Sequence, residues 1–250
     1  MIVRYFNQLA NNERSPKANR HLGYSLAFVA GAVNAGGFLA IGQYTSHMSG
    51  MVASMSDRIV LGDFQFAIAA LSAWLAFVLG AATTAILINY ARHRHWRSEY
   101  ALSLFVEALL LLLFGLDGAY LNHLNEFFDP VTVLLLCYIM GLQNAIITKI
   151  SSAVIRTTHV TGLTTDLGIE LGKMIYINRT DDPALAVRHD REKLILHALL
   201  IFYFFSGGLV GALGFKIIGY STTLFLSAIL IALACGPIIS DIQNGLKAKN

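Results

Sequence analysis

The stretch RTTHVTGLTTDLG, from Arg156 to Gly168, contains a polar hexapeptide that the chain uses twice. The hexapeptide reads TTHVTG at Thr157–Gly162, and its counterpart reads TSHMSG at Thr45–Gly50. Each copy follows an apolar segment with Gly-x-x-Asn-Ala, and the two asparagines, Asn34 and Asn144, stand 110 residues apart. Two polar blocks at matched places in an apolar chain predict a duplicated membrane unit with a site between its halves.

The composition is that of a membrane protein. Of 250 residues, 56% are hydrophobic and only 13% are charged, too few to cover a soluble domain, so most of the surface is expected to face lipid. A helix of about 20 residues spans a bilayer, and continuous apolar runs favour helices over an outer-membrane barrel. We therefore predict an all-α polytopic membrane protein. The predicted spans are Leu22–Ile41, Phe64–Tyr90, Leu102–Leu116, Val131–Ile150, Leu194–Phe215 and Tyr220–Ile239.

The two repeated blocks begin moderately apolar segments, Thr45–Leu61 and Thr157–Ile177, and these leave two topologies open. If both segments cross the membrane, there are eight spans and parallel repeats. If both dip in and return, there are six full transmembrane helices plus two re-entrant or broken helical segments, arranged as two inverted repeats. With a cytoplasmic N-terminus, six spans put 16 of the 18 lysines and arginines inside, so the positive-inside rule favours this model.

The six-span model divides the chain into a cytoplasmic N-terminal segment (1–21), a first membrane repeat (22–125), a second membrane repeat (126–240) and a cytoplasmic tail (241–250). The N-terminal segment has no apolar core ahead of a small-residue cleavage site, so we expect no removable signal peptide. Both termini are therefore expected in the cytoplasm.

Several classes of function are excluded or disfavoured. The net charge of +3 is spread over short loops, which is not typical of a nucleic-acid partner. The two cysteines, Cys137 and Cys235, lie in predicted spans and exclude a disulfide scaffold or a cysteine zinc site. His93 and His95, in RHRHWR, are interpreted as part of a basic rim near lipid headgroups. We expect no cofactor and no metal.

The repeated blocks suit binding of a small polar or anionic solute. Hydroxyls cap the N–H groups of a helix start, glycine permits close approach, and the helix dipole attracts an anion. Histidine adds a donor that is sensitive to protons. Hydroxyls and glycines also serve helix packing in membranes, and asparagines bridge helices, so a structural role stays open. The candidate solute-binding residues are Asn34, Thr45, His47, Ser49, Gly50, Asn144, Thr157, Thr158, His159, Thr161, Gly162 and Asp166.

Three carboxylates are candidates for coupling solute movement to protons. Asp166 and Glu170 share a helical face with His159 and Lys173, and Glu107 lies inside the third predicted span. A carboxylate at the bilayer centre costs about 2.5–3.5 kcal/mol on insertion scales, so such residues are functional candidates. We expect Asp166 to lie deepest; pairing of Glu170 with Lys173 is the structural alternative.

At these motifs the chain resembles the YoaK family of uncharacterised bacterial inner-membrane proteins, over roughly residues 20–240. The resemblance is carried by GAVNAGGF at Gly31–Phe38, GLQNA at Gly141–Ala145 and the two polar blocks. It implies six transmembrane helices and an inner-membrane location, but no substrate. Many members have Thr-Gly-Asn in the first block, where this chain has Ser49, Gly50 and Met51.

The leading hypothesis is a small-solute membrane transporter, coupled to protons, with its site between the two motifs and the lipid bilayer as its surroundings. The alternatives are a channel or a non-catalytic membrane partner. An intramembrane enzyme is less favoured, because His-Glu-x-x-His and Gly-x-Ser-x-Gly motifs are absent. Gly207, Gly208, Gly211 and Gly214 permit close helix contact and would suit a homo-oligomer.

Overall fold

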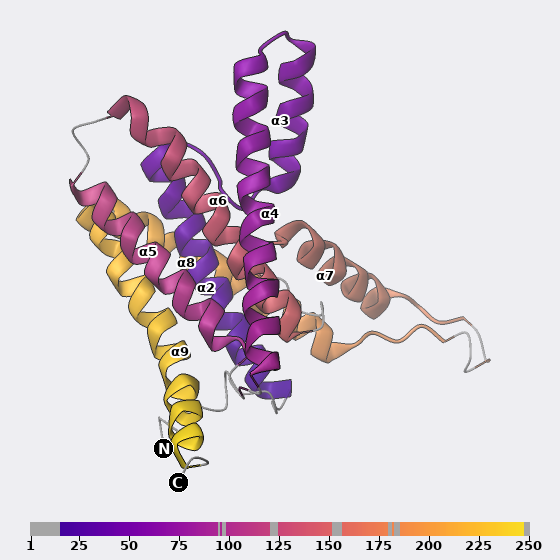
Figure 1. Ribbon diagram of the computed structural model, residues 1–250. Coiled ribbons are helices and arrows are strands. Elements are labelled where there is room, and N and C mark those ends of the chain that lie inside the picture. Colours follow the sequence, from indigo (N-terminus) through magenta and orange to yellow (C-terminus); the bar gives the residue numbers. More distant parts are fainter. Residues whose placement is uncertain are drawn as a thin grey trace.

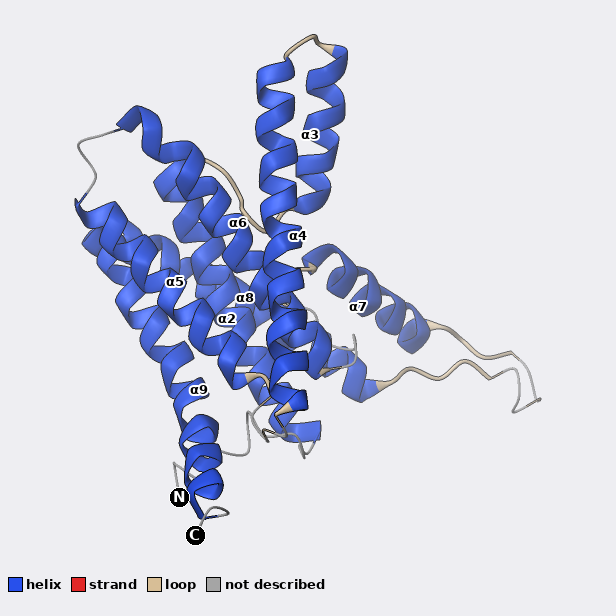
Figure 2. Cartoon of the chain, viewed as in Figure 1, coloured by secondary structure: helices blue, strands red, loops and turns tan. Residues whose placement is uncertain are grey.

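The computed structural model describes residues 16–94, 96, 99–120, 125–151, 157–179, 182 and 186–247. These residues are built from helices, as the sequence predicts (Figure 2). The helices are α2 (Pro16–Ile41), α3 (Met48–Val60), α4 (Phe64–His93), α5 (Ala101–Tyr120), α6 (Asn125–Ile150), α7 (Val160–Ile175), α8 (Arg191–Ile218), a 3-10 turn η1 (Gly219–Ser221) and α9 (Thr222–Lys247). Residues 1–15 of the predicted N-terminal segment lie outside the described residues, as do His95 and Arg156.

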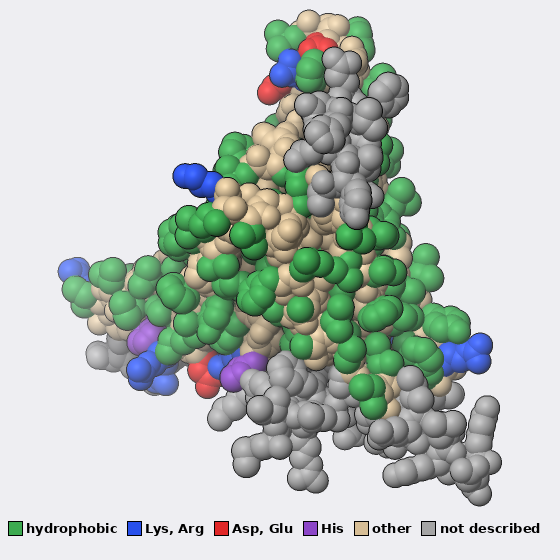
Figure 3. Space-filling model, turned by 90° about the vertical axis from the view of Figure 1, so that its left-hand side faces the viewer, with side chains coloured by type: hydrophobic (Ala, Val, Ile, Leu, Met, Phe, Trp, Pro, Cys, Tyr) green, Lys and Arg blue, Asp and Glu red, His purple; other side chains and the backbone are tan. Residues whose placement is uncertain are grey.

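The described helices include stretches that are long and apolar enough to cross a membrane. These are Ala18–Ile41, Phe64–His93, Pro130–Ile150 and Arg191–Cys235, and the last unites α8, η1 and most of α9; Ala101–Leu116 is a shorter apolar helix. On the face in Figure 3, hydrophobic side chains cover most of the surface between charged groups at its tip and lower edge. Such a broad apolar surface needs lipid around it. The protein is therefore a helical, multi-pass membrane protein.

Turn chemistry separates the helices where the apolar runs end. Gly62 adopts φ +76° between α3 and α4, and Gly219, which ends α8 and begins η1, adopts φ +62°; positive φ values of this kind favour glycine. Asp63 then caps α4, since its carboxylate accepts a hydrogen bond from the N–H of Phe66 at 3.4 Å. A glycine followed by a capping aspartate thus folds α3 and α4 into a hairpin.

Figure 1 shows a bundle from which the hairpin of α3 and the first half of α4 stands clear, while α7 lies beside the bundle. The most extensive contacts join α2 to α8, α4 to α6 and α5 to α9. Helices α2 and α6 form the centre of the bundle. In their apolar membrane-spanning stretches 50% and 56% of the residues are buried, whereas in the stretch of α4 only 22% are. The start of α2 and the end of α9 lie at the same end of the bundle (Figure 1).

Four glycines allow the backbones of the two largest helix pairs to touch. A Cβ on Gly31 would lie 1.9 Å from the carbonyl oxygen of Phe204, and one on Gly207 would lie 2.0 Å from that of Phe28. These contacts join α2 and α8, and close backbone approach of this kind drives helix association in membranes.

The α4–α6 pair repeats this contact at matched positions. A Cβ on Gly141 would lie 2.0 Å from the carbonyl oxygen of Phe77, and one on Gly80 would lie 2.0 Å from that of Tyr138. The contacts of Gly31 and Gly207 therefore have counterparts at Gly141 and Gly80, with the two halves of the chain exchanged.

The helices α2 and α6 cross in antiparallel directions at the centre. Gln143 on α6 donates from Nε2 to the backbone oxygen of Leu26 at 3.1 Å. Further along α2, a Cβ on Gly37 would lie 3.1 Å from the side chain of Leu136. Residue numbers therefore increase along α2 in the direction in which they decrease along α6. This antiparallel crossing positions the two polar motifs.

Candidate functional site

The two polar motifs are each tied to the preceding helix by an asparagine. Asn34 on α2 accepts at Oδ1 from the backbone N–H of Ser46 at 3.3 Å and from its hydroxyl at 2.9 Å. Asn144 on α6 accepts at Oδ1 from the hydroxyl of Thr158 at 2.6 Å. The same side-chain hydrogen bond therefore occurs in both halves, and we call these two places the first and second junctions.

Each junction also holds a buried threonine. Thr45 and Thr157 are fully buried, and neither Oγ1 has a hydrogen-bond partner among the described residues. An unsatisfied buried hydroxyl costs about 1–3 kcal/mol. Each half thus contains a buried threonine hydroxyl whose hydrogen-bonding capacity is unused, and a bound polar molecule would use it.

The histidines follow at the starts of α3 and α7. His47 and His159 are the N-cap residues of these helices, and neither side chain makes a capping hydrogen bond. Both are exposed, so they lie at the rims of the junctions. The His47 ring covers Gly50, where a Cβ would lie 2.1 Å from ring Cδ2, whereas Gly162 has open space. A side chain at position 50 would therefore require the His47 ring to move.

The remaining predicted site residues lie away from the buried junctions. Ser49 on α3 and Thr161 and Asp166 on α7 are exposed. Asp166, which we expected to lie deepest, is on the uncovered side of α7, because α7 packs on α8 through the face with Leu163 and Glu170.

The expected meeting of the two motif helices is not found. Among the described residues, α3 contacts α4 and α7 contacts α8, but α3 and α7 do not contact each other. Each packs against the helix that follows it in the chain. The two halves are instead joined mainly by the helix pairs α2–α8, α4–α6 and α5–α9.

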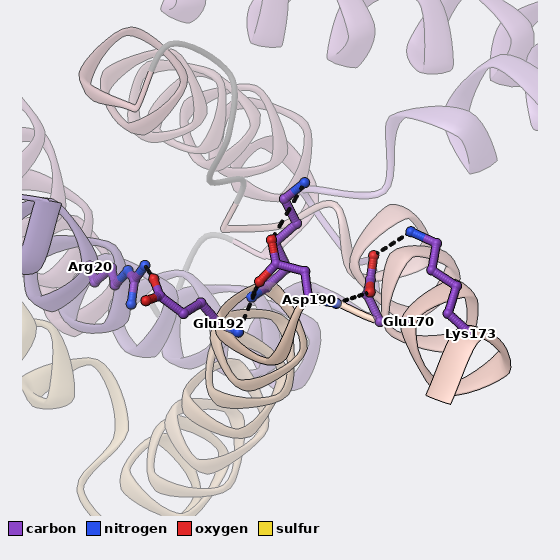
Figure 4. Close-up of polar contacts among 6 residues, drawn as sticks. Arg20, Glu170, Lys173, Asp190 and Glu192 are labelled. Carbon is purple, nitrogen blue, oxygen red and sulfur yellow. Dashed lines mark hydrogen bonds and ion pairs between the residues drawn. The ribbon is translucent and has the colours of Figure 1, made fainter. Parts of the chain in front are cut away.

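Glu170 forms part of a polar network between α7 and the start of α8 (Figure 4). Its Oε1 accepts from the Lys173 ammonium at 2.8 Å and its Oε2 accepts from the N–H of Asp190 at 2.7 Å. The Asp190 N–H and then the Lys173 ammonium hold the pKa of the Glu170 carboxyl below its usual value. Glu170 is thus an ionised residue that fixes α7, which agrees with the structural alternative.

The same network reaches α2. Asp190 caps α8 by accepting from the N–H groups of Glu192 and Lys193, at 3.0 and 3.1 Å. The Glu192 carboxylate pairs with Arg20 on α2 at 2.5 Å, and its side chain is 77% exposed (Figure 4). An exposed ion pair contributes little to stability, so its effect is to orient the helix ends.

Glu107 differs from the other two carboxylates. It is fully buried in α5, and neither carboxyl oxygen has a hydrogen-bond partner among the described residues. No group of three or more metal-binding side chains occurs in the described ranges either, so nothing there suggests a metal site.

Sequence reasoning missed two features of the site. One is Ser46, the partner of Asn34; its equivalence to Thr158 in the repeated hexapeptides was the available signal. The other is a cavity of about 470 Å³ next to the first junction, lined among others by Gln43, Ser54 and Arg58. Arg58 is engaged by an ion pair with Asp63 at 3.0 Å. The cavity is formed only when the α3–α4 hairpin folds, so the linear sequence gives no sign of it.

Comparison with known proteins agrees with the motif resemblance. The model of the family described as "Protein of unknown function (DUF1275)" matches residues 22–236. The chain is similar to the UPF0700 transmembrane protein YoaK of Bacillus subtilis (strain 168), with 25% identity over 191 residues that cover 75% of this chain and 80% of the relative. No solved structure matches. With most of its length covered by the family model, the chain belongs to the DUF1275 family of membrane proteins.

Proposed function

We propose that the protein is a transporter of a small polar or anionic solute, built from six spans in two inverted halves. The observation that carries the proposal is the duplicated junction: an asparagine bonded to a motif hydroxyl beside a buried threonine hydroxyl without a partner. Sites between inverted repeats, at the starts of interrupted helices, are common in secondary transporters.

The helix contacts support the inverted arrangement. If the halves are exchanged, α2 becomes α6 and α4 becomes α8, so the α2–α8 contact becomes the α6–α4 contact; α5–α9 maps onto itself. The paired glycine contacts obey the same exchange. The antiparallel crossing of α2 and α6 agrees with inversion, since parallel repeats would place these equivalent helices in the same direction. Three spans in each half would produce this inversion.

The crossing also sets the spacing of the two junctions. From the antiparallel register, the level of Asn34 on α2 corresponds to about Cys137 on α6, roughly seven residues or ~10 Å before Asn144. The junctions thus lie on opposite sides of the crossing, where a solute would occupy first one and then the other. This two-step arrangement replaces a single site between α3 and α7.

The junctions fit a small polar or anionic solute. The starts of α3 and α7 lack side-chain caps, so their first N–H groups and helix dipoles are available to an anion. Thr45 and Thr157 offer hydroxyls that have no other partner, and His47 and His159 stand at the rims. Water or solute satisfies such opened helix ends in membranes.

The test is solute-induced current in proteoliposomes on a solid-supported membrane, with phosphate, sulfate, nitrate, acetate, lactate and neutral amino acids as probes. We expect a saturable current for one class, reduced at least tenfold by Asn144→Ala or Thr157→Val. Thr165→Val removes an exposed hydroxyl on α7, which bonds only to its own helix, and is the matched control. Movement of a monovalent anion with one proton carries no net charge, so uptake of the radiolabelled probes is measured as well. Neither a saturable current nor saturable uptake for any probe would overturn the proposal, as would junction variants that match the control. A current that rises linearly with concentration would favour the channel alternative.

A further inference from the structure

Among the described residues, Glu107 on α5 is the most isolated ionisable side chain. Its exposed fraction is 0%, and both carboxyl oxygens lack a hydrogen-bond partner. Buried carboxylates in proteins are normally paired, because an ionised group without water or a partner is very unfavourable. The arrangement therefore requires an explanation that packing alone does not provide.

The helix that packs most extensively on α5, the helix of Glu107, is α9. A Cβ on Gly115 would touch Thr223 Oγ1, and one on Gly118 would touch Tyr220, so α5 and α9 run antiparallel in a defined register. In this register Ser227 lies about one turn, or ~6 Å along the axis, from the level of Glu107. The hydroxyls of Ser227 and of Ser103, one turn before Glu107 on α5, are also buried without partners.

No opposite charge compensates Glu107. Helices α4, α6 and α9 and the turn η1 contact α5. The titratable or charged side chains described on these elements are Tyr90, Arg92 and His93 on α4, Cys137, Tyr138 and Lys149 on α6, Tyr220 in η1 and Cys235 on α9. None of them forms a hydrogen bond or ion pair with Glu107. Arg92, the nearest in sequence of the two cations, pairs instead with Glu99 at 2.7 Å.

We propose that Glu107 is a proton-binding site: it carries a proton while α5 is packed against α9, and it releases that proton when this contact opens. A protonated carboxyl is neutral and tolerates the apolar core, whereas the ionised form requires water or a partner. Release of the proton therefore favours a conformation in which α5 and α9 separate, and uptake of a proton favours the packed one.

The two halves differ at the position of Glu107, so the chain has this carboxyl in only one of its two halves. The segment SLFVEALLLL at 103–112 of α5 matches TLFLSAILIA at 223–232 of α9. In this alignment Ser227 is the equivalent of Glu107 in the second half. One half thus carries a carboxyl and the other a hydroxyl. The contact between these equivalent helices therefore contains a carboxyl at this position from one half only.

This site deepens the proposed transport function, on which its coupling role rests. Helix α5 also packs on α6, the helix that carries Asn144 of the second junction. A change in the α5–α9 contact would thus reach the junction through one helix. Of the three predicted coupling carboxylates, Glu107 is the only one that is both buried and unpaired in the described structure, since Glu170 is paired and Asp166 is exposed.

Dicyclohexylcarbodiimide tests the protonation directly, because this apolar reagent modifies protonated carboxyls in apolar surroundings. Purified protein in liposomes would be treated at several pH values and the adduct located by peptide mass spectrometry. We expect Glu107 to be labelled and the labelling to fall at least tenfold as the pH is raised. Glu99 is the matched internal control: it is as well buried and eight residues away, but it pairs with Arg92, so we expect less than a tenth of the labelling.

The outcomes separate the site from the proposed function. Absence of label on Glu107 at every pH, or equal labelling of Glu99, would overturn the proton site even if solute currents are found. Labelling of Glu107 without any solute current would leave the proton site standing and remove the transport proposal. In a transporting protein, Glu107→Gln is expected to reduce uptake driven by a pH gradient at least tenfold; undiminished uptake would overturn the coupling role.

Discussion

The paired backbone contacts predict that Gly141→Ala is strongly destabilising. The added Cβ would lie 2.0 Å from the carbonyl oxygen of Phe77, whereas a Cβ does not lie closer than about 3.0 Å to a non-bonded heavy atom. Helices α4 and α6 must therefore separate locally by about 1 Å. Overpacking of this kind costs about 1–3 kcal/mol. The separation also strains the hydrogen bond from Thr84 Oγ1 to the Leu142 oxygen, 2.9 Å long, which adds about 0.5–1.5 kcal/mol.

The expected total is about 2–4 kcal/mol, which for a chain of this size lowers the melting temperature by roughly 5–15 °C. The assay is thermal unfolding in detergent, followed by intrinsic fluorescence. Gly31→Ala should behave alike, because its Cβ would meet the Phe204 oxygen at 1.9 Å in the equivalent contact. The control is Gly168→Ala in α7, where nothing lies within 4 Å and alanine is the better helix former. A melting temperature of Gly141→Ala within 2 °C of the native protein would refute the reasoning, as would a larger loss in the control.

Three further predictions follow from individual contacts. A double-mutant cycle with Asn144→Ala and Thr158→Val should give a coupling energy of about 0.5–1.5 kcal/mol in unfolding experiments, and a value near zero would show that their 2.6 Å bond does not contribute. The lowered pKa of Glu170 means that its stabilisation is complete above its unfolded value of about 4.3 and is lost as the pH falls through the lower folded value. Acidification from about pH 5 to pH 3 should therefore lower the melting temperature of the native protein more than that of Glu170→Gln; equal decreases would contradict the assignment. Asp63→Ala removes the cap of α4 and the partner of Arg58, so hydrogen exchange at the start of α4 should accelerate at least fivefold, and unchanged exchange would argue against the cap.

Helix positions could be predicted from the sequence because hydropathy alone determines them. Five of the six predicted spans lie within single α-helices, and the sixth, Tyr220–Ile239, begins in the turn η1 and continues along α9. The apolar run from Phe64 begins where the cap at Asp63 starts α4. Membrane insertion requires long apolar helices with their backbone hydrogen bonds satisfied internally. A run of apolar residues in this chain therefore has few alternatives to a helix.

The internal repeats predicted which residues are equivalent, but not which of them are buried. In the structure Asn34 and Asn144 lie at matched junctions, and their hydroxyl partners, Ser46 and Thr158, are equivalent in the repeated hexapeptides. Burial on α7 could not be predicted, because Asp166 and Glu170 stand one turn apart at the edge of the same stripe. Only the packing of α7 on α8 decides which of the two is covered, and it covers Glu170.

Contacts between segments far apart in the chain could not be predicted from the sequence either. The repeated motifs suggested that α3 and α7 meet, whereas each packs on the helix that follows it. The isolation of Glu107 likewise depends on the register between α5 and α9, which is set by close contacts at Gly115 and Gly118. Spacing along one helix carries no information about such a register.

The central claim is that the two halves are inverted with respect to the membrane, and labelling of two introduced cysteines tests it most directly. In a variant without Cys137 and Cys235, cysteines would replace Asp57, on α3 near its turn into α4, or Asp182, in the connection between α7 and α8. Both positions are exposed, and the connection between α7 and α8 is the counterpart of the turn between α3 and α4 in the duplication. The account predicts that a membrane-impermeant maleimide labels position 57 only in right-side-out vesicles and position 182 only in inside-out vesicles. Labelling of both positions from the same side would contradict it.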